Sequence, residues 1–150
     1  MNIQSHFDTA VYQELCSRLE QLQPDTPRLW GCMTTAQMMW HCRQAYKVPL
    51  TSKQLKPHPL SFIARFFAAQ LYNNKPYRQS LPTAKHFRAR DDKDFATEKA
   101  ALRSVMQAFY ERGAAGVGNK RHPIFGTLTA EQWGQSMWKH LDHHLRQFGV

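Results

Sequence analysis

Two histidines near the end of the sequence have the spacing of a shared metal site. His140 and His144 are four residues apart. On a helix such a pair lies within about 6 Å, so both imidazoles can reach one ion. Both fall on a helical face that is otherwise apolar, where an imidazole needs partners for its donor and its acceptor. The apolar residues of that face are Trp133, Met137, Leu141, Leu145 and Phe148.

A third histidine occupies a similar position on another predicted helix. His41 lies on the inward face of a helix that we expect to begin at the capping-box pattern of residues 34–37 and to stop before Pro49. Alone, it is more simply an ordinary core histidine. Beside His140 and His144, it predicts a divalent metal held between two helices, because helical bundles build such sites from facing helices. Three imidazoles suit Zn(II), Ni(II), Cu(II) or Fe(II) and leave coordination positions open.

Two further histidines are candidate catalytic groups. An open metal position can lower the pKa of a bound water towards about 7, and a nearby imidazole can then carry a proton. His143 is about 60° from His140 around the helix, so it could also replace one of the ligands. His122 begins the sequence His-Pro-Ile-Phe-Gly and either lies at the mouth of the site or is an ordinary loop histidine. Cys42 and Asp142 are directed elsewhere around their helices, so we do not expect them to be ligands.

The positive charge is concentrated in one part of the chain. The net charge is +9, and residues 47–90 include nine basic residues and no Asp or Glu. A segment of one sign raises the local concentration of anions such as phosphates, carboxylates or nucleic acid. The same segment could equally be a solvated surface that keeps the protein in solution.

Helical periodicity accounts for the elements that must hold these histidines. No segment alternates apolar and polar residues for long enough to predict a strand. We therefore expect one all-α domain over residues 1–150, a four-helix bundle with a long connection and a short extra helix (61–73) between its second and third long helices. The long helices are predicted at residues 7–22, 34–47, 95–113 and 129–148.

The cysteines and the apolar stretches indicate a cytoplasmic protein that does not enter a membrane. Residues 1–10 lack the basic start and apolar run of a signal peptide. The longest apolar stretch, 62–71, is interrupted by Arg65 and is too short to span a bilayer. The three cysteines form no CxxC pair, which favours a reducing compartment.

Several motifs resemble those of the DinB/YfiT-like superfamily. Residues 33–41, Met-Thr-Thr-Ala-Gln-Met-Met-Trp-His, resemble the segment that delivers the first metal histidine in that superfamily. Residues 140–147, His-Leu-Asp-His-His-Leu-Arg-Gln, resemble its closing HxxxH element. The resemblance is closer still to a branch of unknown function with the pattern His-Pro-Ile-Phe-Gly at 122–126, Trp133 and His-Leu-Asp-His-His-Leu-Arg-Gln-Phe at 140–148.

The resemblance implies a four-helix bundle that binds Zn or Ni through His41, His140 and His144, with a tendency to dimerise. Relatives include metal-dependent transferases that use low-molecular-weight thiols, and hydrolases. This sequence lacks the glycine of the commoner His-Arg-Gly-Gln ending, because Leu145-Arg146-Gln147 follow His144. A relative's thiol specificity therefore does not transfer.

Two classes of function follow. The first is a divalent-metal-dependent enzyme with a small-molecule substrate: either a thiol S-transferase or a hydrolase, with His122 or His143 as proton shuttle. In the transferase version, basic loops that include Arg78, Arg88 and Arg90 hold the carboxylates of the thiol cofactor. The second is a non-catalytic basic interaction protein or nucleic-acid-binding stress-response protein, with the histidines as buried polar core. A third possibility is a helical bundle that retains a vestigial metal site and acts as a scaffold.

Overall fold

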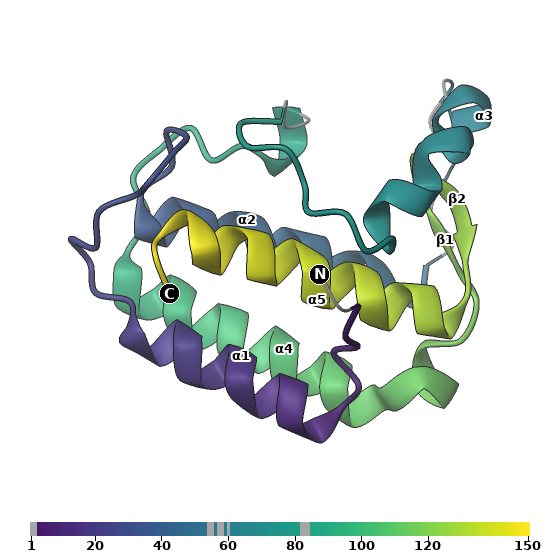
Figure 1. Ribbon diagram of the computed structural model, residues 1–150, viewed down its shortest axis with the longest axis horizontal. Coiled ribbons are helices and arrows are strands. Elements are labelled where there is room, and N and C mark those ends of the chain that lie inside the picture. The colour runs from purple at the N-terminus through teal and green to yellow at the C-terminus, as the bar shows by residue number, and fades with distance from the viewer. Residues whose placement is uncertain (1–2, 54–55, 57–58, 60, 82–84) are drawn as a thin grey trace.

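The described part of the chain is mostly helical, in agreement with the predicted all-α class (Figure 1). The structure is a computed structural model that describes residues 3–53, 56, 59, 61–81 and 85–150. Its longest helix, α4, contacts α1, α2 and α5, and α5 in turn contacts α1 and α2. These helices are α1 (Thr9–Gln21), α2 (Thr35–Leu50), α4 (Phe95–Val117) and α5 (Ala130–Gln147).

Capping residues define where the two histidine-bearing helices begin. At the start of α2, the Thr34 side chain accepts a hydrogen bond from Gln37 N, and the Gln37 side chain accepts one from Thr34 N. Thr129 and Gln132 form the same reciprocal pair at the start of α5. Each arrangement satisfies backbone donors that a helix leaves unpaired, which stabilises the helix by about 1 kcal/mol. The capping box predicted at residues 34–37 is confirmed.

The core between these helices is built mainly from leucine, methionine and aromatic side chains. Leu15, Leu102, Phe109 and Leu141 are completely buried. Burial of one such side chain stabilises the fold by about 1.5–3 kcal/mol. Because α5 is buried along most of its length, several of its polar residues, among them Lys139 and His144, are buried with it. The core therefore forces the histidines of α5 into the interior.

Two predicted helix ends are wrong. Pro49 lies inside α2, which continues to Leu50. The proline is in the last turn, so the missing N–H removes a helical hydrogen bond only where the helix is about to end. Gly113 breaks α4 with a φ of 62°, yet the helix resumes and reaches Val117 before Gly118 caps it. Glycine adopts this left-handed backbone at little cost, so it bends the helix here without ending it.

The expectation of no strands is also wrong. β1 (Lys120–His122) and β2 (Gly126–Leu128) form a short antiparallel hairpin in which His122 pairs with Gly126. Three-residue strands are too short for alternation to be detectable in the sequence. The indole N–H of Trp133 donates to Lys120 O at 3.1 Å, so the hairpin is tied to the first turns of α5.

The predicted long connection between α2 and α4 is present and carries short helical segments. In the described residues these are α3 (Ser61–Ala64), the 3-10 helix η1 (Arg65–Leu71) and the 3-10 helix η2 (Lys85–Phe87). Lys139 of α5, which is 2% exposed, donates to the backbone oxygens of Gln70 and Asn73 and to Asn73 Oδ1. The connection is thus held against α5. No helix in the described ranges is long and apolar enough to cross a membrane.

Candidate metal centre

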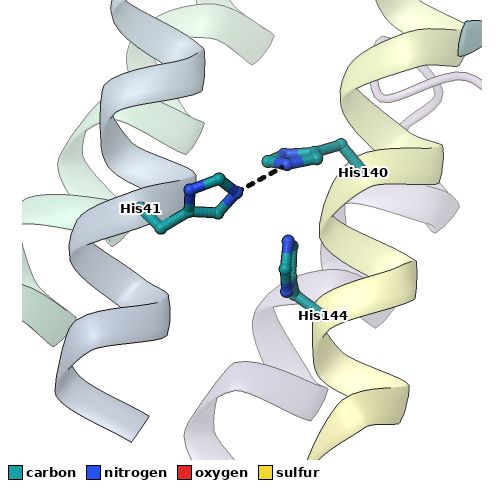
Figure 2. Close-up of side chains that lie close together, drawn as sticks. All are labelled: His41, His140 and His144. Atoms are coloured by element: carbon teal, nitrogen blue, oxygen red, sulfur yellow. Dashed lines mark hydrogen bonds between the residues drawn. The ribbon is translucent and has the colours of Figure 1, made fainter. Parts of the chain in front are cut away.

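The three histidines predicted as ligands lie together. One nitrogen from each of His41, His140 and His144 can be chosen so that all three lie within 4.8 Å of one another. Their ring centroids form a nearly equilateral triangle with sides of 4.8, 4.8 and 5.0 Å. Figure 2 shows the His41 ring reaching from one helix towards the two rings of the facing helix. The predicted association of these histidines is confirmed.

Hydrogen bonds orient two of the three rings. His41 Nδ1 is 2.8 Å from the carbonyl oxygen of Phe87 and must donate to it. His144 Nδ1 is 2.9 Å from Gln147 Oε1, and the Gln147 amide nitrogen donates to Trp30 O at 2.8 Å. Because the amide nitrogen is used in that way, Oε1 accepts from His144. In both histidines Nδ1 carries the proton and the Nε2 lone pair is free for a metal.

The remaining ring, that of His140, lies where its Nε2 could share a metal ion with His41 Nε2. His140 Nε2 is 3.0 Å from His41 Nε2, and His140 Nδ1 is buried without a partner among the described residues. Within the described ranges, His140 Nδ1 is unsatisfied in either case, as an acceptor if the Nε2 atoms share a hydrogen bond and as a donor if they share a metal ion, so it does not distinguish the two. Two nitrogens that are each about 2.0–2.1 Å from one tetrahedral Zn ion are about 3.3–3.4 Å apart, so the 3.0 Å between these two atoms is close to, though shorter than, the separation in a shared site.

The surroundings keep all three imidazoles neutral, which is the form that binds metal. Burial lowers the pKa of His41, and it lowers that of His144 to about 3. Burial, followed by the charges of His144 and His41, places the pKa of His140 well below its usual value. The exposed fractions of His41 and His144 are only 8% and 7%. Metal binding therefore displaces few protons from these rings near neutral pH.

The centre forms part of the wall of a cavity of about 460 Å³. Cavities of this size are typical of small-molecule sites. The residues around the histidines are largely apolar or aromatic, and they come from the connection between α1 and α2, from η1 and the segment after it, and from the hairpin. They include Trp30, Met33, Leu71, Tyr77 and Phe125. The three-histidine cluster thus adjoins a space that can hold a small organic molecule.

The two candidate catalytic histidines lie in different places. His143 lines the cavity, with its ring 5.8 Å from the Trp30 ring and 5.5 Å from the Tyr77 ring. It is not one of the three clustered ligands. His122 is not among the described lining residues: its Nδ1 accepts from Ile124 N and Phe125 N inside the hairpin. Burial lowers the pKa of His122 to about 4.

Only one of the three candidate arginines is among the described residues that line the cavity. Arg88, which follows η2, lines the cavity, whereas Arg78 and Arg90 are not among its described lining residues. All three are exposed. Neither of the residues excluded as ligands is in the cluster: Cys42 Sγ is 3.7 Å from Met38 Sδ, and Asp142 forms a 2.9 Å ion pair with Arg18.

Sequence reasoning missed the groups that support the ligands. Gln147 has the i,i+3 spacing from His144 that lets two helical side chains meet, so this partner could have been found. Phe87 contributes only a backbone carbonyl, which leaves no signature in a side-chain pattern. The sequence also did not identify Lys139, next to His140, as the residue that holds the connection between α2 and α4 against α5.

The sequence matches one family over residues 2–149, and that family is described as "Protein of unknown function (DUF1569)". No curated protein and no solved structure is similar enough to this chain to count as a match. The matched region contains every residue of the metal centre and of the cavity described above.

Proposed function

We propose that this chain, which belongs to the DUF1569 family, is a metal-dependent enzyme that acts on a small molecule in the cavity. The observation that carries the proposal is the convergence of His41, His140 and His144 at the wall of that cavity. Three protein ligands, unlike the four of a closed structural site, leave a position for a reacting group.

The chain's own residues supply the environment for such chemistry. A divalent ion at this centre, Zn or Ni by resemblance, would act as a Lewis acid that lowers the pKa of a bound water or thiol. His143 lines the same cavity, with its ring 5.1 Å from that of His144. Burial lowers the pKa of His143, which favours the neutral ring that can accept a proton from the nucleophile. Trp30 and Tyr77 flank this ring and limit its access to water.

The nucleophile divides the proposal into two versions. With water the protein is a hydrolase, and with a low-molecular-weight thiol it is a thiol S-transferase. The protein loaded with Zn or Ni would be incubated with small electrophiles, with and without thiols, and the products identified by mass spectrometry. A product that contains the thiol supports the transferase, and a hydrolysed product formed without thiol supports the hydrolase.

The helix arrangement supports the proposal that this chain is a four-helix bundle of the DinB/YfiT-like type. The contacts among α1, α2, α4 and α5 are those expected of a DinB/YfiT-like four-helix bundle, as are the positions of the histidines on α2 and α5. We also propose the cytoplasmic location that the cysteine pattern favours and the homodimer that the resemblance implies. Sedimentation of the purified protein tests the dimer: a monomer at all concentrations would contradict it.

Metal analysis tests the central proposal. Wild-type protein, purified without chelators, should contain about one divalent ion per chain, and His41→Ala, His140→Ala or His144→Ala should each lose it. His143→Ala is the matched control, because it removes an imidazole of the same helix and cavity without removing a clustered ligand. Unchanged metal content in all three ligand variants would contradict the proposal, and loss of metal in His143→Ala would reassign a ligand.

The nucleic-acid alternative stays a prediction with its own test. Several phosphate contacts by the basic residues of 47–90 would make affinity for a short duplex fall steeply between 50 and 200 mM salt. Weak, salt-insensitive binding would contradict it.

A further inference from the structure

The cavity beside the metal centre has a mostly apolar wall. Trp30, Leu71, Tyr77 and Phe125 contribute rings or aliphatic carbons from four separate segments of the chain. Such walls bind by removing apolar ligand surface from water, whereas a few polar groups determine the ligand's orientation. The wall therefore selects for a molecule with an apolar body.

The charges around the cavity are one-sided. Arg88 is the only Asp, Glu, Lys or Arg among the described residues that line it. In the described part of the chain, no carboxylate forms an ion pair with Arg88. A guanidinium offers two parallel donors that match a carboxylate or a phosphate. A ligand anion could thus bind here without displacing a protein carboxylate.

Arg88 is also attached to the metal centre through the backbone. The preceding residue, Phe87, accepts the hydrogen bond from His41 Nδ1 at 2.8 Å. The short helix η2 therefore orients a metal ligand and, one residue later, contributes the cation of the cavity. Because both line one cavity, a small molecule bound in it would lie beside both Arg88 and the three histidines.

We propose that the substrate is a small organic anion whose apolar body lies against Trp30, Leu71 and Tyr77 and whose anionic group is bound by Arg88. This inference rests on the proposed function, because it assumes that the cavity is the substrate site of the metal centre. It narrows the three arginines considered from the sequence to Arg88 alone.

Binding of a matched ligand pair tests this inference. The probes are 2-naphthoate and its neutral counterpart 2-naphthamide, added to the protein as purified and followed by calorimetry. Naphthoate should bind about 10- to 100-fold more tightly than the amide, the range expected for hydrogen bonds to a charged group. Arg88→Ala should remove this preference, and Arg88→Lys should retain part of it. Arg78→Ala and Arg90→Ala, which change exposed arginines outside the cavity lining, should leave it intact.

Two more variants locate the probe. Leu71→Trp adds volume to the cavity wall and should weaken both ligands, whereas Phe66→Ser changes a 74% exposed residue outside the lining and should weaken neither. Equal binding of the two probes in wild type, or an undiminished preference in Arg88→Ala, would overturn the inference. A preference lost in His140→Ala but kept in Arg88→Ala would assign the carboxylate to the metal and would overturn it too.

Metal content, measured on the same samples, separates this inference from the proposed function. If the protein contains metal but shows no Arg88-dependent preference for naphthoate, only the proposed substrate class is wrong. If wild type shows the preference but contains no metal, the proposed metal-dependent enzyme is wrong and the anion-binding site at Arg88 stands.

Discussion

Gln147 Oε1 accepts a hydrogen bond from His144 Nδ1 at 2.9 Å, while the amide nitrogen of the same side chain donates to Trp30 O at 2.8 Å. One amide thus sets the orientation of a candidate metal ligand and holds the segment that forms part of the cavity wall. Partners of this kind commonly change metal affinity by 10- to 100-fold.

Substitution of Gln147 should weaken metal binding without removing a ligand. We expect Gln147→Leu to lower the affinity for Zn(II) by about 10- to 100-fold, because His144 loses the acceptor that fixes its ring. Gln147→Glu keeps an acceptor for His144 and should lose less affinity. Competition with a chromophoric chelator measures both variants. Equal affinities in wild type and Gln147→Leu would show that the hydrogen bond does not support the metal.

Gly31 should be sensitive to the addition of one methyl group. Its φ is +78°, and a Cβ there would lie 2.5 Å from Gln147 Nε2. Gly31→Ala should therefore move the Gln147 amide and lower metal affinity as well as stability. Gly113→Ala is the control: its φ is +62°, but a Cβ would have no atom within 4 Å. This control should lose stability and keep its metal affinity, and a similar loss of affinity in both variants would contradict the prediction.

Lys139 should hold the connection over the cavity. Its ammonium donates to oxygens of Gln70 and Asn73, and the ammonium nitrogen lies 4.5 Å from the centre of the Tyr77 ring. Lys139→Met keeps the aliphatic bulk but removes every donor, so backbone amides of residues 65–81 should exchange hydrogen at least about tenfold faster. The control, Lys47→Met, changes an exposed lysine and should leave this exchange unchanged. Unaltered protection in Lys139→Met would refute the role.

His6 should make the fold sensitive to acid. It is completely buried, Nε2 donates to Met106 O at 3.3 Å, and Nδ1 accepts from Tyr46 at 3.1 Å. Burial lowers its pKa from 6.5 to about 4, so between these values the unfolded state binds a proton that the folded state does not. The contribution of neutral His6 to the free energy of unfolding is therefore fully present above pH 6.5. It falls by up to about 3 kcal/mol as the pH is lowered to about 4.

Denaturant titrations between pH 7 and 4 measure this loss. His6→Gln retains a donor and an acceptor but does not titrate, so its free energy of unfolding should depend less on pH than that of wild type. Identical pH dependence in the two proteins would assign the acid sensitivity to another group. The other buried histidines whose pKa burial lowers, which are His122 and the three clustered histidines, would then be the next candidates.

The sequence by itself determined the features that depend on local periodicity. The capping boxes mark where α2 and α5 begin, and the helical repeat places His140 and His144 on one face because both belong to one helix. It also indicated a mostly helical chain and a long connection before α4. It did not reveal the hairpin or the continuation past Pro49 and Gly113, because the strands are too short to show a period and both residues usually end helices.

Only the tertiary structure decided which distant groups meet. His41 is 99 residues from His140, yet their Nε2 atoms are 3.0 Å apart because α2 and α5 pack against each other. Packing of η2 against α2 brings Phe87 O to His41 and Arg88 to the cavity, whereas His122 stays within the hairpin. Side-chain periodicity carries no information about a backbone carbonyl or about the partner of a helical face. The orientation of each histidine ring and the set of residues that line the cavity therefore depend on long-range packing.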